Sequence, residues 1–102
     1  MGRLEMLKEH LAEFPGDAFA RYGLAMEYAN SAQNDAALAE FATLLKENPD
    51  YTAGYFMAAQ TLVKIGKIDA AREMLTNGIA SAKRTNNAHA QSEMESMLSE
   101  LG

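Results

Sequence analysis

The fold is decided by two stretches of equal length: RYGLAMEYANSAQNDAALAEFATLL at residues 21–45 and YFMAAQTLVKIGKIDAAREMLTNGI at residues 55–79. The second stretch begins 34 residues after the first. The matched pairs are Leu24 and Ala58, Ala25 and Ala59, Tyr28 and Leu62, Asp35 and Asp69, Ala37 and Ala71, Phe41 and Leu75, and Leu45 and Ile79. A fixed period of this length is typical of stacked helix-turn-helix units, none of which buries its apolar face alone. The sequence therefore predicts an all-α fold.

The spacing of apolar residues and the positions of helix breakers predict where the helices lie. Asp17 is expected to cap a helix N-terminus, and Gly66 is expected to end one. The proline at position 49 stops another helix, because the residue before proline avoids the helical region. The predicted helices span about residues 3–14, 18–31, 35–47, 52–64, 68–83 and 88–101.

These positions resemble the tetratricopeptide repeat family, as found in small bacterial proteins. The residues that carry the resemblance are Leu24, Ala25 and Tyr28 in one helix, Ala37 and Phe41 in the next, and Pro49 at the close. Arg21 departs from the pattern because the family has an aromatic residue there, whereas Tyr55 fits in the second unit. Lys83 stands in place of the closing proline, so the helix before it is expected to run on for a turn.

The resemblance implies a right-handed α-solenoid in which consecutive helices run antiparallel. The whole chain, 1–102, would form one domain, with a half repeat at 3–16, repeats at 18–51 and 52–84, and a capping helix at 87–101. Small alanines let the helices approach closely, and larger residues fill the gaps between them. The large residues predicted to be buried are Tyr28, Phe41, Leu62 and Leu75.

The resemblance also implies a concave groove lined by the first helix of each repeat. The predicted lining is Phe19, Tyr22, Met26, Ala29 and Asn30 from the first repeat, and Ala53, Phe56, Gln60, Val63 and Lys64 from the second. Within this set, Phe19, Tyr22, Met26, Asn30, Phe56, Gln60 and Lys64 are the expected partner-binding residues. An apolar patch of this kind often binds a partner. Alternatively, the last helix covers part of it, or the aromatic rings pack as ordinary core.

Two features narrow the expected partner. Some family members hold the C-terminal carboxylate of heat-shock chaperones with Lys and Asn, but here Tyr22 and Met26 stand at those places. An amphipathic helix or an extended apolar peptide is therefore the expected ligand. A homodimer formed through the groove face is the alternative. With a net charge of -5, the chain gains nothing from releasing counterions, so nucleic-acid binding is disfavoured.

No pattern of residues indicates a catalytic, metal or cofactor site. The sequence contains no Cys, and its two histidines, His10 and His89, lack ligand spacing, so neither a metal nor another cofactor is expected. No nucleophile motif or phosphate-binding loop is present, which disfavours an enzyme. No apolar run approaches membrane-spanning length, and neither a signal peptide nor membrane binding is expected. We predict a cytoplasmic, non-catalytic protein that binds another protein or a peptide.

Overall fold

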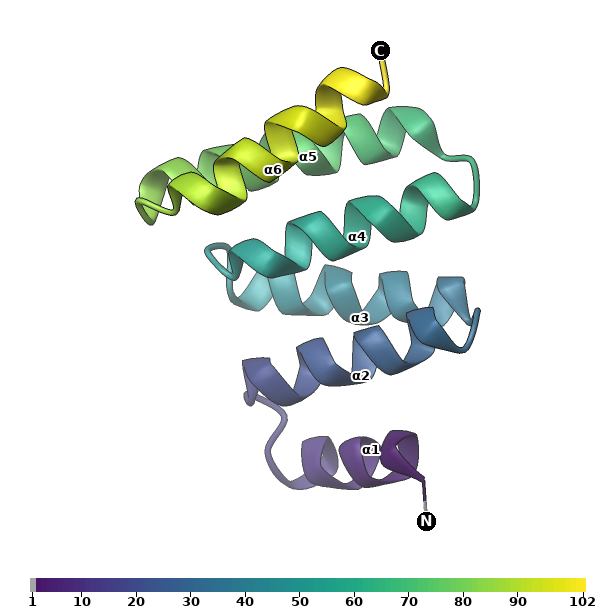
Figure 1. Ribbon diagram of the computed structural model, residues 1–102. Helices are drawn as coiled ribbons and strands as arrows, with labels where there is room; N and C mark the ends of the chain where they lie inside the picture. Colours follow the sequence, from purple (N-terminus) through teal and green to yellow (C-terminus); the bar gives the residue numbers. More distant parts are fainter. Residues whose placement is uncertain (1) are drawn as a thin grey trace.

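The structure, a computed structural model, describes residues 2–102, and every regular element in that range is a helix. The helices stack in chain order from the N-terminus to the C-terminus, with consecutive helices antiparallel (Figure 1). Their bounds are α1 Arg3–Glu13, α2 Ala18–Asn30, α3 Asn34–Glu47, α4 Thr52–Lys64, α5 Ile68–Arg84 and α6 Ala88–Glu100. Each lies within about one residue of its predicted limits, so the all-α prediction is confirmed.

Local chemistry explains where several helices begin and end. The Asp17 carboxylate accepts a hydrogen bond of 3.1 Å from the backbone N–H of Ala20 at the start of α2. This bond, together with a 2.7 Å hydrogen bond that the carboxylate accepts from the His10 imidazole, lowers the pKa of Asp17. After α4, Gly66 adopts a positive φ of 78°, which a residue without Cβ reaches without strain. Asn87 caps α6 through the N–H of Ala90.

The length of α5 follows from the missing proline. The helix α3 ends at Glu47, two residues before Pro49. The equivalent of Glu47 in the second repeat is Ser81, but α5 continues to Arg84. The predicted extra turn is therefore confirmed.

The helices form two layers that differ in how closely their members approach. The backbone of α4 comes close to the backbones of both α2 and α6, whereas within residues 2–102 the Cα atoms of α1 and α3, and those of α3 and α5, stay more than 8 Å apart. The even-numbered helices thus lie closer together than the odd-numbered ones. A stack whose two layers have unequal spacing curves toward the closer layer, so the layer of α2, α4 and α6 is the inner, concave one.

The core runs between the layers and contains most of the large residues predicted to be buried. Phe41 is 1% exposed, Leu62 7% and Leu75 0%. The prediction for Tyr28 was wrong, because this side chain is only half-buried. Tyr28 packs between α2 and α1, with the Lys8 ammonium 5.8 Å from its ring centre. The ring thus lies against α1 without being fully covered by it.

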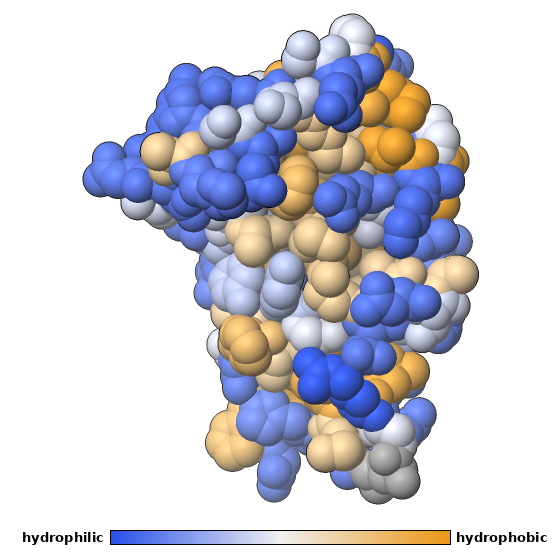
Figure 2. Space-filling model, in the orientation of Figure 1, coloured by the Kyte–Doolittle hydropathy of each residue, from blue (hydrophilic) through white to orange (hydrophobic). Residues whose placement is uncertain are grey.

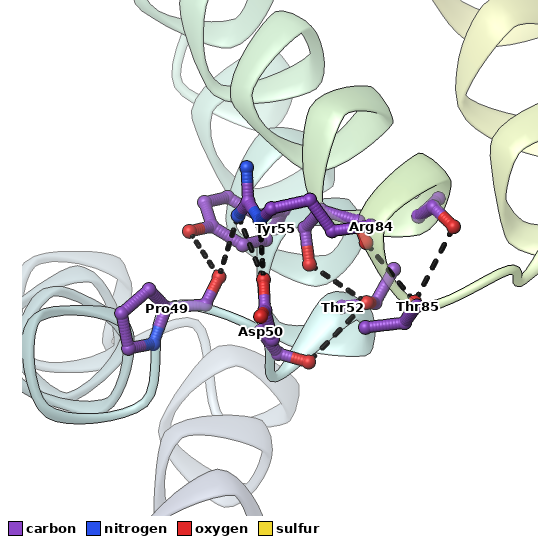
Figure 3. A network of polar contacts seen from close by, with 8 residues as sticks. Pro49, Asp50, Thr52, Tyr55, Arg84 and Thr85 are labelled. Atoms are coloured by element: carbon purple, nitrogen blue, oxygen red, sulfur yellow. Dashed lines mark hydrogen bonds and ion pairs between the residues drawn. The ribbon is translucent and has the colours of Figure 1, made fainter.

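Arg21 takes over the role of the aromatic residue that it replaces. Its guanidinium donates a 3.1 Å hydrogen bond to the carbonyl of Pro15 and forms an ion pair of 2.6 Å with Glu40. In the second repeat, the Tyr55 hydroxyl donates a 2.7 Å hydrogen bond to the carbonyl of Pro49 (Figure 3). Both side chains therefore tie the start of a repeat to the turn before it.

The second repeat carries a further set of contacts at this turn. Arg84 forms an ion pair of 2.7 Å with Asp50, and its hydrogen bond to that carboxylate raises the pKa of Arg84 (Figure 3). Beneath them, the hydroxyls of Thr52 and Ser81 share a buried hydrogen bond of 2.8 Å. These contacts bind the extended end of α5 to the start of α4.

Replacing Ala32 with glycine is expected to stabilise the protein by about 0.5–1 kcal/mol. Ala32 has a φ of 59°, and its equivalent one repeat later is Gly66. The left-handed conformation costs a residue with a Cβ roughly 1–2 kcal/mol, part of which is offset because glycine gains freedom in the unfolded chain. Thermal unfolding followed by circular dichroism should show a melting temperature a few degrees higher. The reciprocal change Gly66→Ala should lower it, and a fall with Ala32→Gly would contradict the explanation.

Candidate partner-binding surface

A hollow of about 470 Å³ opens on the concave side between α4 and α6. Two residues of α4 and one stripe of α6 form it. Its lining is Phe56, Gln60, His89, Ser92, Glu93, Ser96, Met97 and Glu100. The two apolar members, Phe56 and Met97, are half-buried and pack against the core cluster around Leu75 and Met94. The hollow therefore has an apolar base and a polar rim.

The rim is polar because α6 presents its hydrophilic residues there. Over the α5–α6 turn and the beginning of α6, the surface is mostly hydrophilic, with paler apolar surface below it (Figure 2). Glu93 lies 3.1 Å from the imidazole of His89, a contact that is an ion pair only when the histidine is protonated. Both side chains remain accessible, with 48% of Glu93 and 87% of His89 exposed.

Of the residues predicted to bind a partner, Phe56 and Gln60 line this hollow. Tyr22 and Met26 lie on the adjacent inner helix but pack against the core cluster that contains Phe41. The Tyr22 ring centre is 6.4 Å from that of Phe41 and 5.3 Å from that of Tyr51. Burial among these rings raises the pKa of Tyr22. Tyr22 and Met26 thus form a half-buried wall of the inner layer and do not line the hollow.

The remaining predicted residues lie outside the hollow. Phe19 is 76% exposed at the first turn of α2, while Asn30 and Lys64 are exposed at the ends of their helices. Ala29 is buried and Val63 half-buried. Ala53 lines a different hollow, of about 720 Å³, formed with the α5–α6 turn.

The sequence predicts a capping helix and, as one alternative, that this helix covers part of the groove, but it identifies none of the α6 residues that line the concave surface. The apolar stripe of α6 is packed inward, with Met94 fully buried. The adjacent stripe, spaced at three and four residues along α6 and sharing Met97 with the apolar one, faces the hollow. The sequence does contain a signal for this second stripe, because the polar residues of α6 recur at the same helical spacing as its apolar residues.

Two further structural properties bear on function. No helix within residues 2–102 combines the length and apolar character that crossing a membrane requires. Across the same residues, no three His, Cys, Asp or Glu side chains are grouped as metal ligands.

The sequence and the fold of the chain are similar to those of known proteins. A model of the tetratricopeptide repeat matches residues 28–92. The chain belongs to the tetratricopeptide repeat family. A TPR repeat-containing protein of Pseudomonas aeruginosa is 26% identical over 98 residues, which cover 96% of this chain and 93% of the relative. Tetratricopeptide repeats form protein-protein interaction modules, and this general role is what the family supports for the chain.

Solved structures confirm the fold. A protein from Bordetella parapertussis superposes with a TM-score of 0.86 at 27% identity, covering 99% of this chain and 88% of its own. A tetratricopeptide repeat domain protein from Salinibacter ruber superposes with a TM-score of 0.81 at 28% identity, covering 85% of this chain and 88% of its own. The TPR2B domain of yeast Sti1, solved in a complex with pHsp70, superposes with a TM-score of 0.89 at 17% identity, covering 96% of this chain and 78% of its own. At that identity, the likeness to the yeast domain concerns the fold alone.

Proposed function

We propose that this tetratricopeptide repeat chain is a non-catalytic module that binds a peptide or helical segment of another protein on its concave layer. The observation that carries the proposal is the hollow between α4 and α6. Its base includes Phe56, a large aromatic side chain that the core covers only in part. An aromatic residue at the base of a hollow with polar groups at its rim is the usual composition of a recognition site.

Each residue of the surface has a specific role in this proposal. Phe56 and Met97 provide the apolar contact, and the Gln60 amide supplies hydrogen bonds to the backbone of the bound segment. Tyr22 and Met26 extend the binding face along α2. Phe19, Asn30 and Lys64 lie at its margins and contact a longer ligand.

The experiment removes the aromatic base of the hollow. Peptides that bind the protein would be selected from a displayed random library, and the affinity of the best one would be measured for the Phe56→Ala variant. Loss of a buried Phe contact worth about 1.5–3 kcal/mol should weaken binding roughly 10- to 100-fold. Circular dichroism would verify that the variant stays helical.

Phe14→Ala is the matched control. Phe14 is 55% exposed and lies in the turn after α1, away from the hollow. The control variant should keep full affinity for the peptide. Equal affinity for both variants would contradict the proposal.

A homodimer through the same face is the competing outcome. Sedimentation equilibrium across a range of concentrations measures it directly. Self-association that Phe56→Ala abolishes and Phe14→Ala leaves intact would assign the hollow to a second copy of the chain.

A further inference from the structure

The charge of the hollow between α4 and α6 determines which segment it fits. Two of its lining residues, Glu93 and Glu100, carry carboxylates, and no Lys or Arg lines it. The whole of α6 contains three glutamates and neither Lys nor Arg. The hollow is therefore an acidic site above an apolar base.

Neither carboxylate is neutralised by a permanent cation. Within residues 2–102, the one ion-pair partner of Glu93 is the imidazole of His89, and Glu100 has none. Lys64 ends α4, the other helix of the hollow, but it does not line the hollow and forms no ion pair among the same residues. The two negative charges thus remain available to a ligand.

The geometry of α6 sets the spacing of the charges. Glu93 and Glu100 are seven residues apart on one helix, which places them about 10 Å apart along its axis at about 1.5 Å per residue. In a polyproline II segment, residues three apart lie on the same side and about 9 Å apart. Two basic residues separated by two others in such a segment therefore match the two carboxylates.

We propose that the hollow between α4 and α6 binds an extended basic peptide segment, with two Lys or Arg residues three positions apart that pair with Glu93 and Glu100. This inference rests on the proposed function and specifies its partner. The long stems of Lys and Arg pack against apolar surface while their charged ends stay in water, which suits the base formed by Phe56 and Met97. An arginine over the Phe56 ring adds a cation–π contact. The hollow provides the binding site, and its carboxylates make that site selective for a basic peptide.

Three blocked peptides of equal length test the proposal. One contains Arg-Pro-Ala-Arg, and the other two replace both arginines with Gln or with Glu. Each would be titrated into isotopically labelled protein at low salt, and amide chemical shifts would map the binding site. The Arg peptide should shift residues of α4 and α6 around the hollow, and its affinity should exceed that of the Gln peptide roughly tenfold. Raising the salt concentration should remove most of this difference, because exposed charges are screened.

Paired variants tie the effect to the two carboxylates. The double change Glu93→Gln and Glu100→Gln should lower the affinity for the Arg peptide roughly tenfold and remove the salt dependence of that affinity. Glu95→Gln is the matched control, because Glu95 lies on the same helix but does not line the hollow. It should leave the affinity unchanged.

The outcomes separate this inference from the proposed function. If the Gln or Glu peptide shifts the hollow as strongly as the Arg peptide, the hollow binds segments but does not select basic ones, and only the inference is overturned. If the Arg peptide binds but shifts only residues elsewhere, or if no peptide shifts the hollow, the inference is overturned. The proposed function is then decided separately by the library-selected peptide, whose affinity for the Phe56→Ala and Phe14→Ala variants tests the hollow itself.

Discussion

Replacing Phe41 with alanine is expected to destabilise the protein by about 3–5 kcal/mol, the range measured for large buried aromatic residues. The side chain is 1% exposed and packs in a cluster with Ala25, Ala37, Leu44 and Ala58. These neighbours come from three helices, α2, α3 and α4. Larger half-buried side chains, among them Tyr22, Met26 and Met74, also pack against this cluster. Removing the ring therefore takes away packing contacts on several sides.

Urea unfolding followed by circular dichroism measures this change. Phe19→Ala is the matched control, because the same atoms are removed from a side chain that is 76% exposed. Its free energy of unfolding should change little. A Phe41→Ala variant as stable as the control would show that the repeat is placed in the wrong register.

The change Gly78→Ala is expected to cost about 1–3 kcal/mol, the range for forcing an extra group into a packed core. A Cβ at Gly78 would lie 2.5 Å from the sulfur of Met94 and 2.6 Å from the Cβ of Tyr55. The methionine side chain can move, but the Tyr55 Cβ is fixed to the backbone of α4. The two helices must therefore separate, which opposes the gain that alanine normally brings to a helix interior.

Gly23→Ala should have the opposite effect. Gly23 lies within α2, where a new Cβ would meet the side chains of Arg3 and Leu7 at 3.5 Å and 3.6 Å, which are ordinary contact distances. With room available, alanine should raise stability by up to about 1 kcal/mol. Melting temperatures of the two variants should therefore move in opposite directions. A Gly78→Ala variant that melts higher than the parent protein would contradict the close packing of α4, α5 and α6.

Much of the fold could be predicted because its determinants are local. Asp17 and Gly66 act through their own backbone surroundings, so a single sequence reveals them. The burial of Phe41 and Leu75 follows from helical period and repeat register. The prediction for Tyr28 was wrong because the exposure of its ring depends on how completely α1 covers α2, and the register of the repeat does not specify that contact.

The candidate site was predicted only in part for a related reason. The register of the repeat correctly indicated that Phe56 and Gln60 lie on the inner layer. It could not show that one side of the Tyr22 ring packs against Tyr51, because that contact joins α2 to the turn before α4. Nor could it show that α6 completes the hollow, because this helix has no matched partner within the two repeats. The close approach of Gly78 to Met94 could not be predicted either, because it joins α5 to α6, and α6 belongs to neither repeat.

The shared role of Arg21 and Tyr55 has a consequence for how such repeats evolve. What the position requires is a hydrogen-bond donor that reaches the carbonyl of the preceding proline, and a guanidinium and a phenol both meet that requirement. The identity of the residue is then free to drift between chemically unlike types while the joint between units is kept. An exchange between such residue types at this position therefore preserves the joint between units.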